Sequence, residues 1–205
     1  MAEGHAWLNA TFGVQPNVGW QLDPFGHSAT SAALLGRMGF RGVVINRINY
    51  ALKARWNAQR ALEYAWEGVA PSLHWSPVFT HVLSNHYSTP KGLDFEGASD
   101  VRPEVVRGLA GTLRAEAIKR SESYRTRHLM VLIGDDFRWR RSEHLYRVWD
   151  SMIAELNRRT NGKGLDVHWS TPSRYLAAAM EAFAPPAAGT PTTANAANAA
   201  DAANA

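Results

Sequence analysis

A short apolar segment that ends in an Asp-Pro-Phe-Gly-His-Ser run constrains this chain more than any other feature. The segment covers residues 18–22, and Asp23 follows it directly. Pro24 and Gly26 then favour a turn, and a helical pattern of small residues begins at Ser28, a good N-capping residue. The run therefore predicts a strand, a turn and a helix, with the Asp23 carboxylate presented to a pocket at the end of the strand.

Strand and helix patterns alternate along most of the chain. Strands are expected at 18–22, 42–45, 128–133 and 165–169, and helices at 28–38, 103–124, 142–159 and from Pro172 onward. Between them, residues 62–66 suit either a strand or a helix, and residues 72–97 are rich in proline, glycine, histidine and serine and are expected to be mostly loop. This alternation predicts an α/β fold with a mainly parallel sheet and surrounding helices.

Polar side chains follow each expected strand at the point where it ends. They are Asp23, Asn46, Arg47, Asp135, Asp136, Ser170 and Thr171. Parallel β/α architectures place their active sites at the carboxyl ends of the strands. We therefore expect these side chains to converge at one end of one sheet.

A second motif, Gly134-Asp135-Asp136-Phe137-Arg138-Trp139, sets two acids beside aromatic residues. A lone Asp-Asp pair usually caps a helix or forms a turn. Its expected strand-end position, taken together with the first motif, favours carbohydrate chemistry instead. A retaining glycosidase uses one carboxylate as nucleophile and another as acid/base, roughly 5–5.5 Å apart.

Composition and charge exclude several classes of protein. The 205 residues are 45% apolar and 20% charged, which is typical of a globular domain, and no run approaches the roughly 20 apolar residues of a membrane span. No signal peptide is visible at the start of the sequence. Without cysteine there can be no disulfide, thiolate metal ligand or cysteine nucleophile.

Basic residues gather at 114–127 and 138–147, although the net charge is only +4. Nucleic-acid binding is one interpretation, and solvated helix faces are the other. We favour solvated faces, because phosphate binding needs positive charge focused on one surface and five acids lie within these segments or shortly after them. The acids are Glu116, Glu122, Glu143, Asp150 and Glu155.

Taken together, the motifs resemble one family, the family 38 glycoside hydrolases, which are α-mannosidases of the lysosomal type. The Asp-Pro-Phe-Gly-His-Ser and Gly-Asp-Asp-Phe-Arg motifs carry most of the resemblance. Further family-like segments lie at 12–16, 38–40, 46–50, 62–66, 79–83 and 168–175. The resemblance covers about residues 1 to 180, in family order and with similar spacing.

The resemblance implies a role for each matching residue. Asp23 would be the nucleophile and a ligand of Zn²⁺, and Asp136 would be the acid/base. Phe25 would lie beside the bound sugar, Arg47 would contact the nucleophile region, and Tyr87 would contact substrate. The implied activity is retaining, zinc-assisted hydrolysis of terminal α-linked mannose from mannose-containing oligosaccharides, in a lysosome or another endomembrane compartment; the oligomeric state stays open.

The chain also departs from the family pattern. The family's zinc site needs a His-x-Asp pair on an earlier strand and a later histidine, and none of the eight histidines here matches those positions. His27 could substitute as a ligand, but a histidine in such a turn more often bonds to the backbone. We therefore expect an incomplete β/α barrel at 1–184 and a disordered low-complexity tail at 185–205. The alternative to a glycosidase is a truncated, non-catalytic fragment that lacks most zinc ligands.

Overall fold

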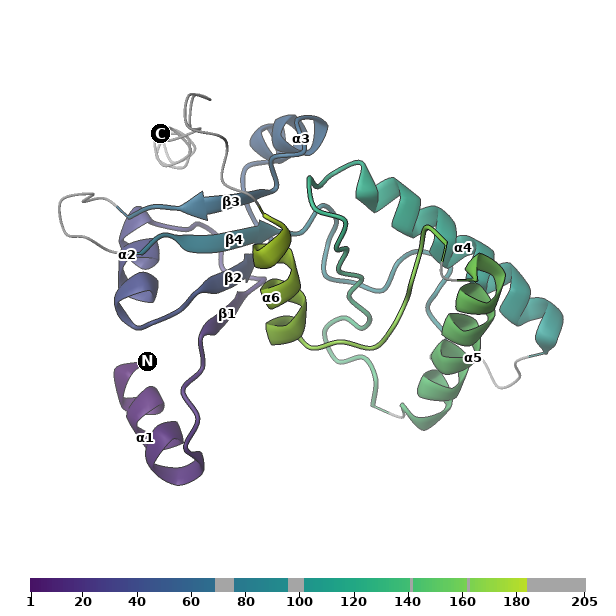
Figure 1. Cartoon of the computed structure of the whole chain (residues 1–205), viewed down its shortest axis with the longest axis horizontal. Helices are drawn as coiled ribbons and strands as arrows, with labels where there is room; N and C mark the ends of the chain where they lie inside the picture. The colour runs from purple at the N-terminus through teal and green to yellow at the C-terminus, as the bar shows by residue number, and fades with distance from the viewer. Residues whose placement is uncertain (69–75, 96–101, 141, 162, 184–205) are drawn as a thin grey trace. The chain divides into compact units, whose positions relative to one another are not determined.

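The computed structural model describes residues 1–68, 76–95, 102–140, 142–161 and 163–183. These residues form two compact units, each of which is described by itself (Figure 1). The first unit comprises residues 1–85, 123–128 and 172 onward, and the second comprises residues 86–122 and 129–171.

A four-stranded sheet organises the first unit. Its strands are β1 (Val18–Gln21), β2 (Gly42–Ile45), β3 (Glu63–Trp66) and β4 (Val78–Val82), in the spatial order β1-β2-β4-β3. β1, β2 and β4 run parallel, and β3 is antiparallel to β4. Gln21, Ile45 and Val82 are level in the register, so the segments that follow the three parallel strands leave the sheet at the same edge.

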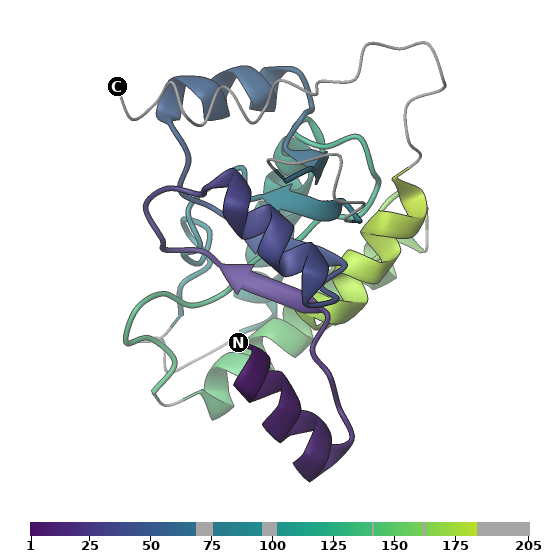
Figure 2. The same cartoon turned by 90° about the vertical axis from the view of Figure 1, so that its left-hand side faces the viewer.

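Two helices cover opposite faces of this sheet (Figure 2). α6 (Pro172–Ala182) packs where Phe183 meets the ring of Phe79. α2 (Ala29–Arg37) packs beside Val78, the residue before Phe79. Because neighbouring residues of a strand point to opposite faces, the two helices lie on different sides. The close approach of α6 needs a glycine at position 42, where a Cβ atom would come 3.2 Å from Leu176 Cδ1.

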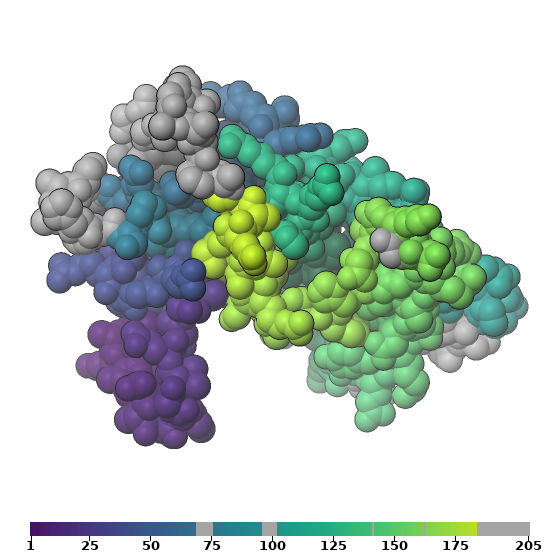
Figure 3. Space-filling model, in the orientation of Figure 1, coloured from purple at the N-terminus to yellow at the C-terminus, as the bar shows by residue number. Residues whose placement is uncertain are grey.

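The two remaining helices of the first unit are less embedded. α3 (Tyr50–Ala58) is capped by Asn49, whose side chain accepts a bond from Leu52 N–H at 3.1 Å. α1 (Ala2–Phe12) has no buried residue and lies on the outside of the unit (Figure 3). Its exposed Trp7 and Phe12 rings meet edge to face. Among the described residues, none of the helices is long and apolar enough for a membrane crossing.

Polar side chains occupy the centre of the first unit, between the sheet and α6. Glu63 and His81, each 1% exposed, pair across β3 and β4 at 3.0 Å. Thr126 donates to the other Glu63 oxygen at 3.1 Å, and the Tyr175 hydroxyl of α6 lies 3.3 Å from Glu63 and 3.2 Å from His81 Nδ1. The ring of Tyr124 stacks on His81. These bonds satisfy polar groups that would otherwise be costly to bury.

The second unit is built on two helices, α4 (Pro103–Ser121) and α5 (Glu143–Thr160). Pro103 starts α4 at a position where its missing N–H is harmless. The helices pack together around one apolar core, and α5 supplies most of it, namely Leu145, Val148, Trp149, Met152 and Leu156. Ala110 and Leu113 of α4 and the loop residues Leu93 and Phe95 complete the core.

Several elements differ from the sequence prediction. Residues 128–133 and 165–169 are not strands, because side chains satisfy their backbone groups in place of a neighbouring strand. Arg120 donates to Met130 O at 3.0 Å, and the Asn157 amide bonds to both the N–H and the C=O of Val167. In the region expected to be mostly loop, β4 is instead a buried central strand, and α3 was not expected at all.

The α/β class and the mainly parallel sheet agree with the prediction. The strand at 42–45, the helix capped by Ser28 and the helix from Pro172 also lie where they were expected. Whether the sheet belongs to an incomplete barrel stays a prediction. The predicted disordered tail at 185–205 lies outside the described residues.

Candidate functional site

Asp23 and Arg47 form an ion pair at the carboxyl edge of the sheet in the first unit. Arg47 donates from Nε to Asp23 Oδ1 at 2.7 Å, and its Nη2 lies 2.6 Å from the same oxygen. Asp23 follows β1 and Arg47 follows the adjacent β2, so the parallel register brings the two side chains together. The Asp23 side chain is 61% exposed and the Arg47 side chain 35%, which leaves the carboxylate open to a ligand.

Phe25 lies beside this pair. The Arg47 guanidinium carbon is 4.6 Å from the centre of its ring, within the range of a cation–π contact. The Phe25 ring is 81% exposed, so it is not part of the packed core. A carboxylate, a guanidinium and an open aromatic face thus stand together within one small region.

His27 closes the turn from the other side. Its Nε2 donates to Arg47 O at 3.0 Å, and its ring meets Trp66 edge to face. Burial lowers the pKa of His27, partly offset by the bond to the Arg47 carbonyl, so the imidazole is held neutral. The expectation that this histidine bonds to the backbone is therefore confirmed.

One residue of this region was missed by sequence reasoning. Lys53, in the first turn of α3, donates to Asn46 O at 3.1 Å and to Asn46 Oδ1 at 2.9 Å. Burial and the charge of Arg47 lower the pKa of Lys53 to about 8. No pattern in the sequence pointed to Lys53, because a lysine on a short helix is usually solvated.

The second acidic motif forms a tight turn in the second unit. Gly134 pairs with Thr89, its N–H donating to Thr89 Oγ1 at 2.7 Å and its carbonyl accepting from Thr89 N at 2.8 Å. The next residue, Asp135, accepts a bond from the N–H of Asp136 at 2.8 Å. Phe137 and Trp139 both adopt positive φ angles, at 60° and 66°, which few non-glycine residues tolerate.

The surroundings of Asp135 favour the ionised form of its carboxylate. Hydrogen bonds from the Ser88 side chain and from the Asp136 N–H lower the pKa of Asp135, and His86 and Arg138 add to the effect. Asp135 is therefore ionised throughout the neutral range. It places a fixed negative charge next to Asp136, whose side chain is exposed.

Tyr87 lies on the loop that supports this turn. Its neighbours Ser88 and Thr89 bond to Asp135 and Gly134, and its own half-buried ring packs on His86 at 4.0 Å between ring centres. The structure therefore places Tyr87 close along the chain to the residues that hold Asp135.

The predicted site residues thus fall into two groups. Asp23, Phe25 and Arg47 meet in the first unit, whereas Tyr87 and Asp136 belong to the second. The expectation that every polar residue follows a strand of one sheet is wrong for Asp135, Asp136, Ser170 and Thr171, because the segments before them are not strands. The approach of Asp23 to Asp136 stays a prediction.

The described residues do not fit a complete zinc site. Among them, no group of three or more His, Asp or Glu side chains could hold a metal ion. Asp23 could offer one oxygen ligand, but a zinc ion needs about four ligands, and His27 uses its Nε2 on a backbone carbonyl. The described residues therefore supply no complete ligand set for a zinc ion.

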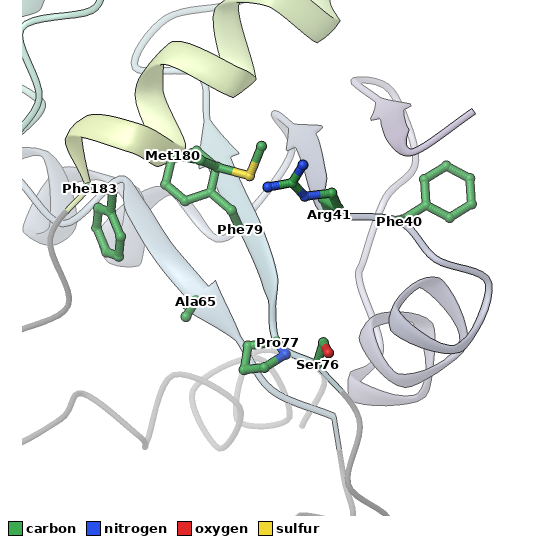
Figure 4. A pocket seen from close by; sticks show the side chains of 8 residues that line it. All are labelled: Phe40, Arg41, Ala65, Ser76, Pro77, Phe79, Met180 and Phe183. Carbon is green, nitrogen blue, oxygen red and sulfur yellow. The ribbon is translucent and has the colours of Figure 1, made fainter. Parts of the chain in front are cut away.

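A pocket of about 370 Å³ lies at the opposite end of the same sheet (Figure 4). Phe40 and Arg41 precede β2, and Met180 and Phe183 come from the end of α6. Because Arg47 follows β2 at its other end, this pocket is separate from the Asp23–Arg47 pair. None of the predicted site residues lines it.

A carboxylate paired with arginine beside an exposed aromatic ring, at the end of parallel strands, is an arrangement suited to a glycoside hydrolase. The comparisons identify the family. The sequence model of the glycosyl hydrolases family 38 N-terminal domain matches residues 1–195, and the chain belongs to this family.

Named relatives agree with this assignment. The chain is 34% identical to a lysosomal α-mannosidase of Dictyostelium discoideum over 190 residues, which cover 89% of this chain and 19% of that protein. It is 36% identical to an α-mannosidase of Arabidopsis thaliana (84% and 18% covered) and 32% identical to the lysosomal α-mannosidase of Cavia porcellus (86% and 19%). The chain thus spans about a fifth of the length of these relatives.

A solved structure supports the fold. The crystal structure of an α-mannosidase from Enterococcus faecalis matches with a TM-score of 0.60 at 19% identity, over 91% of this chain and 18% of that one. At this identity the likeness concerns the fold alone.

Proposed function

We propose that this chain carries the two catalytic carboxylates of a retaining α-mannosidase that releases terminal mannose from mannose-containing oligosaccharides. The observation that carries the proposal is the Asp23–Arg47 pair with Phe25 beside it. The α-mannosidase relatives support mannose as the sugar, and the two named as lysosomal favour a lysosomal type of compartment.

The first chemical step uses both carboxylates. Asp23 attacks the anomeric carbon, the bond from that carbon to the leaving oxygen breaks, and Asp136 gives its proton to the leaving oxygen. The product is a mannosyl ester of Asp23. Arg47 fixes the direction of the Asp23 carboxylate, because two of its nitrogens lie on one carboxylate oxygen.

The second step returns both residues to their starting state. Asp136, now a carboxylate, takes a proton from water while the water oxygen attacks the anomeric carbon, and the ester bond to Asp23 breaks. Two inversions leave the configuration retained. Phe25 offers an apolar face to the C–H groups of the sugar, and Tyr87 offers a hydroxyl to the substrate.

Zinc enters the proposal only through Asp23, as one of the ligands that the resemblance implies. When bound, a zinc ion would help to orient the sugar hydroxyls. The described residues lack the other ligands, so every step above uses the chain's own carboxylates. The alternative of a non-catalytic chain stays a prediction.

Covalent trapping tests the proposal on the chain itself. A fluorinated mannosyl fluoride loses fluoride without a proton and leaves a slowly hydrolysed ester, which mass spectrometry locates by peptide mapping. We expect the label on Asp23 and its loss in Asp23→Asn, with Glu67→Gln as an exposed control acid. A label on another residue would contradict the nucleophile assignment, and no label with no mannose binding would favour the non-catalytic alternative.

A further inference from the structure

The main chain that carries Arg47 is held by a side chain on each of two consecutive carbonyls. Lys53 donates to the carbonyl of Asn46, and His27 donates to the carbonyl of Arg47. Asn46 itself is only 3% exposed, and its side-chain oxygen accepts a second bond from Lys53. The position of the guanidinium thus depends on how these two carbonyls are held.

The placement of Lys53 follows from how α3 begins. Asn49 caps the helix, and the N–H of Lys53 bonds to Asn49 O at 2.8 Å, which puts Lys53 in the first turn. From there its ammonium reaches back to the segment that joins β2 to α3. An ammonium only donates hydrogen bonds, and Asn46 offers it two acceptors, the backbone oxygen and the side-chain oxygen.

A positive charge at the position of Lys53 carries a free-energy cost. The Lys53 side chain is half-buried and lies near a second cation, Arg47, and these two facts lower the pKa of Lys53 to about 8. An apolar residue would pack here without that penalty. Arg47, Asp23 and His27 are charged or titratable groups of this segment and its neighbours. Arg47 repels the ammonium, and neutral His27 adds no further positive charge.

We propose that Lys53 is a positioning residue: by holding both oxygens of Asn46 it fixes the segment that carries Arg47 and so sets the guanidinium on the Asp23 carboxylate. The role for catalysis rests on the proposed function, in which Asp23 is the nucleophile. The role in holding Arg47 stands on the contacts alone. Since a neutral amine is a weaker donor than an ammonium, the hold loosens as pH rises through about 8.

Exchange of the Arg47 Nε–H with water, measured by NMR on the full chain, tests this directly. Arg55 is exposed on α3, the helix that carries Lys53, and serves as an internal reference for base-catalysed exchange. In Lys53→Met we expect the ratio of Arg47 to Arg55 exchange rates to rise about tenfold, the loss of roughly one hydrogen bond. Lys53→Arg, which keeps a cation that donates, should recover part of the protection.

The pH profile separates positioning from a merely structural role. In the wild type the exchange ratio should rise through about pH 8, and in Lys53→Met it should be flat. A wild-type ratio that does not change with pH, or a Lys53→Met ratio equal to that of the wild type, would overturn the proposal. An equal rise in the exposed control Lys163→Met would also overturn it, because general loosening would then be the cause.

Labelling by the mannosyl fluoride tests both the role of Asp23 and the role of Lys53, and its outcomes distinguish failure of one from failure of the other. If Asp23 is labelled, Lys53→Met should slow labelling about tenfold while Lys163→Met leaves it unchanged. If the wild type is not labelled at all, the proposed function fails, and the exchange ratios still decide whether Lys53 positions Arg47.

Discussion

Arg47 places two of its nitrogens on the same oxygen of Asp23, with Nε at 2.7 Å and Nη2 at 2.6 Å. The pair joins the ends of two neighbouring parallel strands, and Phe25 lies on the guanidinium. The arrangement holds the carboxylate in one orientation without burying it.

Removing the guanidinium should harm chemistry far more than stability. In Arg47→Met we expect labelling of Asp23 by the mannosyl fluoride to slow by about 100-fold, the usual effect of losing a preorganised electrostatic partner. The free energy of unfolding should change by no more than about 1 kcal/mol, because the pair is largely exposed. Urea unfolding and labelling rates measure the two effects. Arg158→Met, which breaks an exposed pair with Glu155, is the control and should leave labelling intact.

The two acids of the second motif should behave differently. In a form of the enzyme that turns over, Asp136→Ala should spare an activated aryl mannoside, whose leaving group needs no proton, and should lose natural glycans. Asp135→Ala should not show this split, because the lowered pKa of Asp135 leaves it without a proton to give. Steady-state rates on both substrates decide the matter. Equal loss of both activities in a folded Asp136→Ala protein would refute the acid/base assignment.

Zinc should bind this chain weakly or not at all. Asp23 is one possible ligand, and the described residues offer no group of three that could complete a site. Calorimetry of the chain with Zn²⁺ should therefore show no tight stoichiometric binding, and Asp23→Ala should leave the trace unchanged. Tight binding that Asp23→Ala abolishes would show that further ligands exist, and His27→Ala would be the first variant to test.

The candidate site of the first unit was readable from the sequence because its determinants are local. A strand followed by Asp-Pro and a helix capped by Ser28 fixes Asp23, and a β-branched run fixes the strand before Arg47. Parallel pairing of consecutive strands then brings the two side chains together without further information.

The remaining elements depend on contacts that a sequence pattern does not encode. Residues 128–133 read as a buried strand, yet Arg120 and Tyr175 supply hydrogen bonds that a neighbouring strand would have made. β4 was hidden because proline, glycine and histidine around it suggested a loop, although Val78–Val82 is buried at every position. The contact of Lys53 with Asn46 and its proximity to Arg47 arise only in the folded chain, so the sequence pattern does not show them.

The buried pair beneath the site should dominate the stability of the first unit. Glu63→Ala removes the partner of His81, Thr126 and Tyr175 at once, and we expect a loss of about 3–5 kcal/mol in the free energy of unfolding. Tyr175→Phe should cost less, about 1–3 kcal/mol, since it deletes one hydroxyl. Urea denaturation followed by tryptophan fluorescence measures both. Glu104→Ala, on an exposed pair with Arg102, should change little, and an effect of similar size there would argue against the network.

The pH dependence of the free energy of unfolding should reveal the lowered pKa of Lys53. Its pKa is about 8 in the folded chain and about 10.4 in an unfolded one, so between these values the unfolded chain binds more protons. Stability should therefore gain from Lys53 as pH rises from about 8 toward 10, and this gain should be lost as pH falls through 8. Buried Tyr64 and Tyr175, whose pKa values are raised, act in the opposite sense above about pH 10, so the comparison is made below that pH. We expect the unfolding free energy of the wild type to rise relative to that of Lys53→Met over pH 7–9.5, and Lys163→Met to follow the wild type. Parallel curves for the wild type and Lys53→Met would mean that the ammonium is fully solvated and does not hold Asn46.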